Sequence, residues 1–349
     1  MHSSSLNRRT FLKTASGLLL APAMPMIARD VSAQEASVVV GTWGGDYQNL
    51  LQKIVNPLAG GANVVFDTGN AVARATKVRA EKNARRGTMD VVLLQDVDMY
   101  DLSRAEVFET LTAKEVPNIV NTIELFRTPY SIPHIFSAMV LVYNTEKFKT
   151  PPESFTAALD PALRGRTGFS DILFVANTLF AGLANGGNMS SFDPGMRFLG
   201  EIKKNDPKIF PSNEAVAAAL KSGEIWMTCM WKARALQWQD AGLPLGFVVP
   251  REGAVAVTFE GAVPRNSRNK SGAQKYLNAM LDPKGQVEFA RAMGYAPTVQ
   301  NADMPADLKA RVSFTEAELQ RVKPYDSKSL ADLKNGCLEY WNKSFKAGA

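Results

Sequence analysis

Histidine and cysteine are scarce in this sequence. Its 349 residues include two of each, His2 and His134, and Cys229 and Cys337. Zinc sites draw on several histidines or on closely spaced cysteine pairs, and this chain offers neither. His134 stands between a proline and an isoleucine, which favours a packed structural role. We therefore expect no metal site.

Catalytic motifs are missing as well. The sequence contains no Gly-x-Ser-x-Gly nucleophile elbow and no phosphate-binding loop with its lysine. The sequence therefore holds no positive evidence for catalysis. We expect neither an enzyme nor a bound cofactor.

No stretch is long and apolar enough for a membrane-spanning helix, which needs about 20 such residues. The first 33 residues are instead typical of an export leader, with Arg8-Arg9 before a weakly apolar stretch and a cleavage point after residues 31–33. Paired arginines indicate a twin-arginine signal, but Asn7 departs from that pattern and leaves a general secretory route open. No cysteine lies near the predicted cleavage point, so we do not expect a lipid anchor. We predict a cleaved leader at residues 1–33 and a soluble protein of the periplasm.

Positive charge exceeds negative charge only slightly. Four of the 40 basic and one of the 34 acidic side chains fall in the leader, which leaves a net charge of about +3. That excess does not predict nucleic-acid binding. The one basic cluster, residues 74–86, has the spacing of an outward, solvated helix face, and Arg74 is included in it.

The length of the chain predicts two domains. The 316 residues after the leader exceed what one hydrophobic core comfortably organises. An oxidising compartment would permit a Cys229–Cys337 disulfide. The sequence does not show whether the two Cα atoms approach each other, so this pairing stays open.

Strands and helices alternate along the chain, which predicts parallel βαβ units and an α/β fold. The expected strands are 37–42, 64–66, 89–94, 137–145, 225–231 and 255–261, and the expected helices are 46–58, 70–86, 213–221, 269–281 and 316–346. Residues 95–98 are expected to form a loop, and Lys149-Thr-Pro-Pro152 marks a change of domain. Ligands collect at the carboxyl ends of parallel strands, which directs attention to residues 43–47 and 95–98.

Several motifs, in this order, carry a resemblance to a known family. They are Trp43-Gly44-Gly45, residues 131–134 before the crossover strand, residues 221–225 (Lys-Ser-Gly-Glu-Ile), Trp231, and the stretch from Asn269-Lys270 to Gly294-Tyr295. Together they resemble the periplasmic solute-binding proteins of ABC importers, most of all the spermidine/putrescine-binding group. The resemblance covers nearly the whole chain after the leader.

The resemblance implies a bilobal type II periplasmic-binding-protein fold, in which two α/β lobes are joined by a hinge with two crossovers near residues 143 and 250. Residues 34–142 and 251–300 would form lobe 1, and residues 143–250 and 301–349 would form lobe 2. It also implies a monomer that captures a small amine-containing solute, a polyamine such as putrescine or spermidine, and delivers it to the transmembrane subunits of an ABC permease.

The family's aromatic ligand wall falls on three positions of this chain, Trp43, Trp231 and Tyr295, with Tyr47 as a weaker candidate. A ring face attracts an alkylammonium group by a cation–π interaction of about 0.5–2 kcal/mol. The alternative for each ring is ordinary core packing.

The acidic part of the implied site fits the sequence less well. Glu260 lies one position out of step with the expected acid, and a strand that points Phe259 into the cleft points Glu260 away from it. Asp96, Asp98 and Asp171 are further candidates for the carboxylate.

Basic residues after Trp231 favour a different ligand. Lys232 and Arg234 would repel a purely cationic solute, whereas a carboxylate or phosphonate would gain a charge-assisted hydrogen bond. A zwitterionic amino acid, an ω-amino acid or an aminophosphonate is therefore the alternative to a polyamine. A few proteins of this fold act on pyrimidine precursors, which keeps an enzyme as a further alternative.

Overall fold

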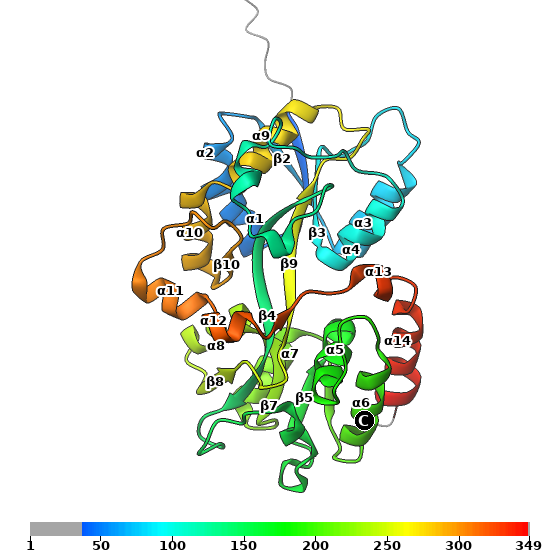
Figure 1. Ribbon diagram of the computed structural model, residues 1–349, viewed down its shortest axis with the longest axis vertical. Coiled ribbons are helices and arrows are strands. Elements are labelled where there is room, and N and C mark those ends of the chain that lie inside the picture. Colours follow the sequence, from blue (N-terminus) through cyan, green and yellow to red (C-terminus); the bar gives the residue numbers. More distant parts are fainter. Residues whose placement is uncertain (1–36, 348–349) are drawn as a thin grey trace, which may run out of the picture. The chain divides into compact units, whose positions relative to one another are not determined.

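The computed structural model describes residues 37–347, so the leader predicted at residues 1–33 lies outside the described residues. Strands and helices alternate as the sequence predicted (Figure 1). The strands are β1 (Val38–Thr42), β2 (Val64–Thr68), β3 (Val91–Gln95), β4 (Ile132–Asn144), β5 (Thr167–Ser170), β6 (Lys208–Phe210), β7 (Met227–Trp231), β8 (Leu245–Val248), β9 (Ala254–Ala262), β10 (Ala296–Pro297) and β11 (Val322–Lys323).

Helices lie between most of these strands along the chain. They are α1 (Asp46–Leu50), α2 (Asn56–Leu58), α3 (Ala71–Ala80), α4 (Asp96–Arg104), α5 (Phe174–Ala184), α6 (Asp193–Lys203), α7 (Asn213–Ser222), α8 (Lys232–Asp240), α9 (Lys270–Met280), α10 (Pro283–Met293), α11 (Ala306–Val312), α12 (Glu316–Leu319), α13 (Ser327–Leu330) and α14 (Lys334–Tyr340). Two π-helical turns are Leu51–Val55 and Trp341–Phe345, and 3-10 turns cover Pro117–Asn121, Glu124–Phe126, Phe155–Leu159, Pro161–Leu163 and Asp171–Leu173.

One sheet connects all of these strands. Its order is β2-β1-β3-β9-β4-β7-β5-β6, with β8 and β10 paired to β4 and β11 paired to β9. β1 runs parallel to β2 and β3, and β5 runs parallel to β6 and β7. The antiparallel pair of β4 and β9 lies between these two parallel groups (Figure 1). The two parallel groups therefore depend on the same two central strands.

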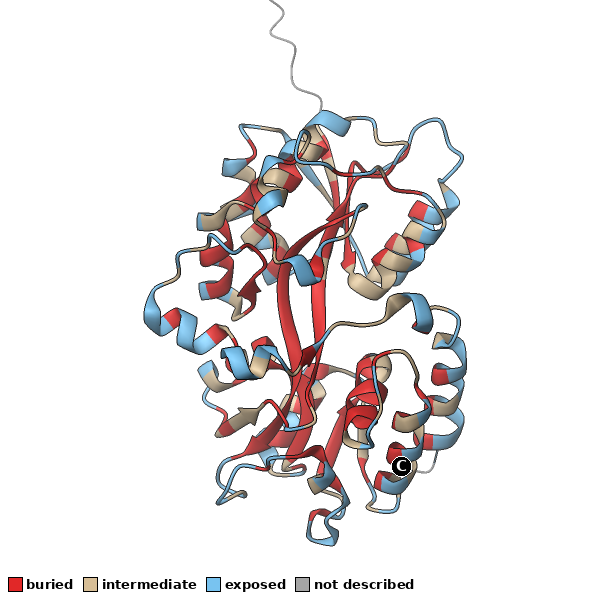
Figure 2. Cartoon of the chain, in the orientation of Figure 1, coloured by how far each residue is buried: buried red, intermediate tan, exposed pale blue. Residues whose placement is uncertain are grey.

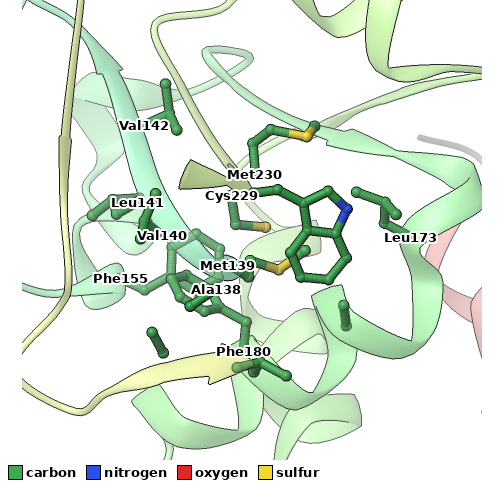
Figure 3. Packing of buried hydrophobic residues seen from close by; sticks show 14 of the residues in the cluster. Ala138, Met139, Val140, Leu141, Val142, Phe155, Leu173, Phe180, Cys229 and Met230 are labelled. Atoms are coloured by element: carbon green, nitrogen blue, oxygen red, sulfur yellow. The ribbon is translucent and has the colours of Figure 1, made fainter. Parts of the chain in front are cut away.

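The central strands are also the most buried part of the sheet (Figure 2). All 13 residues of β4 are buried, and β9 is buried except at Phe259. One hydrophobic cluster packs around β1, β3, α1, α9 and α10, and another packs around β4, β5, β7 and α5. Figure 3 shows part of the second cluster, which includes Met139 and Leu141 of β4, Met230 of β7, and the rings of Phe155 and Phe180. Phe259 packs against both clusters, which places it between them.

These two clusters agree with two lobes, although the bounds given above for each lobe stay a prediction. Residues 301–349 were assigned to lobe 2, and α14 does contact α5. α11, however, contacts α10, and α13 contacts α4. The C-terminal part of the chain therefore touches elements of both predicted lobes.

The loop predicted at residues 95–98 is wrong. Asp96 begins α4, and Gln95 is extended at the N-cap position with φ −77° and ψ 155°. Asp96 and Asp98 lie in the first helical turn, where an acidic side chain interacts favourably with the positive end of the helix dipole. The acidic pair that looked like a loop signal is a helix-start signal.

The single helix predicted at residues 316–346 is interrupted. After α12, Val322 pairs with Ala254 of β9 as part of β11, and the next residues are Lys323 and Pro324. Proline has no backbone N–H and does not continue a helix, so the chain stays extended before α13 begins.

The disulfide that the sequence left open is not formed. Cys229 and Cys337 are free, buried thiols. The Cys229 Sγ lies 3.3 Å from the Asn177 Oδ1, and the Cys337 Sγ lies 3.5 Å from the Thr178 Oγ1. Burial raises the pKa of both thiols, that of Cys337 to about 11.

Candidate ligand-binding cleft

A cleft of about 280 Å³ opens at the carboxyl ends of β1, β3, β5 and β7, where an α/β sheet usually binds its ligand. Its lining brings together five of the predicted site residues, Trp43, Tyr47, Trp231, Arg234 and Tyr295. Three more lining residues, Gly44, Asp46 and Gln95, lie in the two segments expected at the sheet edge, residues 43–47 and 95–98. The other lining residues were not predicted as site residues: Ile135, Ile172, Leu173, Asn213, Gln237, Phe259 and Met293.

Two glycines set the positions of the rings from the predicted lobe 1. Gly45 has a φ of 69°, a left-handed conformation that favours glycine, and it turns the chain from β1 into α1 between Trp43 and Tyr47. Gly294 ends α10 with a φ of 73° and is followed directly by Tyr295. These turns explain why the Trp-Gly-Gly and Gly-Tyr motifs both mark the cleft.

The aromatic residues pack edge to face around Phe259. The ring centroid of Phe259 lies 5.4 Å from that of Trp43 and 5.3 Å from that of Tyr295. The rings of Trp43 and Tyr47 are 5.6 Å apart at an interplanar angle of 82°. Such edge-to-face pairs are favourable and keep each ring in a defined orientation. Trp231 reaches the same cleft from the end of β7 and is 4% exposed.

Arg234 supplies positive charge to the cleft. It lies on α8, and its Nη1 donates to the Gln237 Oε1 at 3.0 Å, while the Gln237 Nε2 donates to the Met293 carbonyl at 2.8 Å. The Arg234 Nε is buried and has no hydrogen-bond partner in the described part of the chain. Burial raises the pKa of Tyr295, and the nearby Arg234 guanidinium opposes that rise. Arg234 is therefore oriented beside the rings, and its Nε–H has no acceptor within residues 37–347.

The other polar groups of the cleft are an acid and two amides. Asp46 is exposed at the start of α1, and Gln95 ends β3. Asn213 begins α7 and is 8% exposed, and its Oδ1 has no partner within residues 37–347. Asp46 and Arg234 are the charged residues of this lining.

Arg74 lies behind Trp43, and its predicted place on a solvated helix face is wrong. It is 3% exposed, and its guanidinium donates to the carbonyls of Leu93, Thr42 and Gly69 at 2.8, 2.8 and 2.9 Å. Its Cζ lies 4.7 Å from the centroid of the Trp43 ring. Burial lowers the pKa of Arg74 to about 10. The rest of the predicted basic face, such as Arg79, is exposed.

Two of the predicted acids bind other parts of the protein. Asp98 forms an ion pair with Lys334 at 3.3 Å. Asp171 accepts hydrogen bonds from the Trp341 Nε1 at 2.7 Å and from the Lys346 Nζ at 2.5 Å, which lower its pKa against the opposing effect of burial. Neither carboxylate lines the cleft, because both are held by the C-terminal segment.

Asp96 and Glu260 line a second cavity, of about 230 Å³, together with Tyr130 and Tyr325. The alternation of β9 explains this position: Phe259 faces the cleft, and Glu260 faces away from it. Glu260 accepts hydrogen bonds from the hydroxyls of Ser131 at 2.6 Å and Thr258 at 2.8 Å. Burial raises the pKa of Glu260 to about 7, and burial together with Glu260 raises the pKa of Asp96 well above its ordinary value.

Lys232 is buried and points away from the cleft. Its Nζ donates to the Ser313 carbonyl at 2.5 Å and lies 4.6 Å from the centroid of the Phe314 ring. Burial lowers the pKa of Lys232 to about 8. This ammonium group fastens the segment before α12 to α8.

Sequence signals existed for some of the cleft residues that were missed. Gln237 lies three positions after Arg234, which is the spacing of side chains that meet on a helix. Gln95 ends a strand at the expected sheet edge. For Asn213 and Met293 the sequence held no local signal, because only the packing of α7 and α10 brings them to the cleft.

Between residues 37 and 347, His, Cys, Asp and Glu form no group of three or more with the spacing of a metal site. None of the helices in that range is both long and apolar enough to cross a bilayer.

Comparison with known proteins gives a consistent family. Residues 58–316 match the family described as bacterial extracellular solute-binding protein. The spermidine/putrescine-binding periplasmic protein of Escherichia coli K12 is 26% identical over 223 residues, which cover 56% of this chain and 64% of that protein. Its counterpart in Salmonella typhimurium LT2 is 24% identical over 247 residues, 67% of this chain and 70% of that protein.

Solved structures confirm the bilobal type II periplasmic-binding-protein fold. The Atu4243 GABA receptor matches with a TM-score of 0.78 and 19% identity over 90% of this chain and 98% of its own. The spermidine/putrescine-binding protein PotD of Streptococcus pneumoniae matches with a TM-score of 0.71 and 18% identity over 87% and 99% of the two chains. AgtB of Agrobacterium tumefaciens R10, solved with agropinic acid, gives 0.70 and 21% over 89% and 98%.

Proposed function

Because the chain belongs to the bacterial extracellular solute-binding protein family, we propose that it is an exported receptor for a small organic solute. It would capture the solute in the cleft and deliver it to the transmembrane subunits of an ABC permease. Trp43 and Tyr295 line the cleft from one predicted lobe, and Trp231 lines it from the other. A ligand that contacts both lobes favours the closed form only through the contacts that it gains there.

The ligand class that fits the cleft best is a zwitterion that carries both an amine and a carboxylate, such as an ω-amino acid. The observation that carries this proposal is Arg234, whose buried Nε has no partner beside the aromatic wall. A carboxylate would accept charge-assisted hydrogen bonds from this guanidinium. The acids proposed for an amine, Asp96, Asp98, Asp171 and Glu260, lie outside the cleft, which leaves Asp46 to face an ammonium group.

Arg74 adds a second electrostatic argument. Its guanidinium already occupies one side of the Trp43 ring at 4.7 Å. A cation on one face of a ring reduces the attraction of that ring for a second cation on the other face. A ligand with two or more positive charges and no negative charge therefore gains little from this wall and is repelled by Arg234.

A polyamine is the second candidate. Two observations favour it: the curated relatives are spermidine/putrescine-binding proteins, and the cleft keeps the aromatic wall that suits methylene chains. An aminophosphonate would meet Arg234 in the same way as a carboxylate.

Ligand-dependent thermal stability and calorimetry would separate these classes. We expect 4-aminobutanoate or 5-aminopentanoate to raise the unfolding midpoint and putrescine and spermidine to leave it unchanged, since a ligand at 100 times its Kd adds about 2.7 kcal/mol of stability. Arg234→Ala should weaken the amino acid roughly 10- to 100-fold, as expected for a lost hydrogen bond to a charged group. Arg291→Ala, an exposed arginine on α10, is the matched control and should change nothing.

Stabilisation by diamines alone, unaffected by Arg234→Ala, would replace the zwitterion with a polyamine. Recovery of chemically altered ligand after incubation would contradict the receptor role itself and favour an enzyme.

A further inference from the structure

Tyr47 and His134 form a buried pair at the wall of the cleft. The Tyr47 hydroxyl oxygen lies 2.8 Å from the His134 Nδ1. Tyr47 lines the cleft, whereas His134 lies behind it and is 1% exposed. The second ring nitrogen of His134, Nε2, is buried and has no hydrogen-bond partner within residues 37–347.

A bulge in β4 aims His134 at Tyr47. Pro133 pairs with Glu260 and Ile135 pairs with Phe259, so His134 is the extra residue with no partner on β9. Such a bulge redirects side chains out of the regular alternation of a strand. Its backbone is held in place, because the His134 carbonyl accepts from the Gln286 Nε2 at 2.5 Å and from the Thr298 Oγ1 at 3.1 Å.

The surroundings of the imidazole are apolar, with the ring of Phe289 4.6 Å away between centroids. Burial lowers the pKa of His134 to about 3, so the ring is neutral at physiological pH. A neutral imidazole carries one N–H and one acceptor nitrogen. The unpartnered Nε2 is therefore either a buried donor without an acceptor or a buried lone pair without a donor.

The second arrangement is the more favourable one. In either arrangement one donor has no acceptor among residues 37–347: with the hydrogen on Nδ1 it is the hydroxyl of Tyr47, a residue that lines the cleft, and with the hydrogen on Nε2 it is an N–H enclosed behind the cleft. A ligand or solvent in the cleft can offer an acceptor to the first donor but not to the second, which places the hydrogen on Nδ1. The Nδ1–H then donates to the Tyr47 oxygen. The opposite tautomer would make Tyr47 the donor to His134 and would leave the buried Nε2–H without an acceptor.

We infer that His134 is a positioning residue, whose Nδ1–H bond to Tyr47 leaves the tyrosine hydroxyl proton to be donated to an acceptor atom of the ligand. The inference rests on the proposed function, since it assumes that a ligand with such an acceptor occupies the cleft. A carboxylate provides one. A protonated amine has no lone pair and cannot accept this hydrogen bond, so the pair selects against a ligand that carries ammonium groups alone.

The tautomer is open to direct measurement without any ligand. His134 is the one histidine after the leader, so two-bond proton–nitrogen correlation spectra of ¹⁵N-labelled protein contain a single imidazole pattern. We expect a protonated Nδ1 and a lone-pair Nε2, unchanged from pH 5 to pH 8. A protonated Nε2, or a ring that gains a second proton in this range, would overturn the inference.

Binding variants test the consequence for the ligand. Tyr47→Phe should weaken 4-aminobutanoate about tenfold, the loss expected for one hydrogen bond, and should change putrescine binding less than about twofold. His134→Leu should resemble Tyr47→Phe. His134→Asn offers an amide N–H near the place of Nδ1–H and should bind within about threefold of the unaltered protein.

The outcomes separate the two proposals. An Nδ1–H tautomer with no effect of Tyr47→Phe on 4-aminobutanoate would refute the positioning role and leave the ligand class standing. Failure of 4-aminobutanoate to bind the unaltered protein would refute the ligand class, and the tautomer spectrum would still decide the state of the pair. Unfolding midpoints of each variant identify any loss of binding that comes from misfolding.

Discussion

Glu260 should make the stability of this protein fall between pH 5 and pH 8. The carboxyl is 4% exposed, and burial raises its pKa from 4.5 to about 7. In the unfolded chain it returns to its ordinary value, so between these two pKa values the folded protein holds a proton that the unfolded chain has released. The contribution of this proton to the free energy of unfolding is fully present below about pH 4.5, and it is lost as the pH rises through about 7.

The size of the effect follows from the two pKa values. Each pH unit between them is worth about 1.4 kcal/mol, so the separation of 4.5 and about 7 corresponds to about 3 kcal/mol. Glu260→Gln replaces the carboxyl with a neutral group of the same shape, and the hydroxyls of Ser131 and Thr258 can rotate to serve either as donors or as acceptors. We expect the variant to match the unaltered protein at pH 5 and to exceed its free energy of unfolding by about 3 kcal/mol at pH 8.

Urea unfolding of both proteins at several pH values is the appropriate assay, because the midpoint and slope give the free energy of unfolding directly. Burial and the neighbouring Glu260 raise the pKa of Asp96, so Glu260→Gln also removes a negative charge beside Asp96, and the comparison reports on the pair of carboxyls. Glu201→Gln, at an exposed residue on α6, is the control and should show no such pH dependence. A difference between Glu260→Gln and the unaltered protein that stays constant from pH 5 to pH 8 would refute the reasoning.

Two further predictions concern buried groups. Cys229 and Cys337 are free and buried, so a thiol reagent should label neither in the folded protein and both after denaturation. A reductant should leave the unfolding midpoint unchanged, and a midpoint lowered by reductant would reveal a disulfide. Burial lowers the pKa of Lys232 from 10.5 to about 8, so the cost of burying its ammonium group is present below about pH 8 and disappears as the pH rises toward 10.5. Relative to Lys232→Met, the unaltered protein should therefore gain on the order of 2 kcal/mol of stability between pH 7 and pH 10, as followed by urea unfolding of both proteins; a gain of the variant over that range would contradict the prediction.

The cleft-lining rings Trp43, Trp231 and Tyr295 were expected from the family resemblance, and each lies beside a feature that is visible in the local sequence. Gly45, two positions after Trp43, and Gly294, directly before Tyr295, take a left-handed conformation, and such glycines leave a local signature. Trp231 ends a strand whose apolar run was visible in the sequence. The period of two along β9 also predicted correctly that Phe259 and Glu260 face opposite ways.

The predictions that were wrong, those for Asp171 and Arg74, concern residues whose partners come from distant segments of the chain. Asp171 was a reasonable carboxylate for a ligand until the C-terminal Trp341 and Lys346 bound it, and these residues lie about 170 positions away. Arg74 looked solvated because its neighbours on α3 are charged, but the carbonyls that it binds come from β1 and β3 and from the turn after β2. The spacing of charged residues along one helix gives no information about partners on other strands and turns.

The position of β9 limits how this protein can be divided. β9 lies between β3 and β4 in the sheet, although it follows β4 by more than a hundred residues in the chain. A fragment that stops at Asn144 would carry β1 to β4 and would lack the strand that joins β3 to β4. Split reporters and chimaeras should therefore exchange β4 and β9 together, and a biosensor that inserts a fluorescent protein should use surface loops outside this pair.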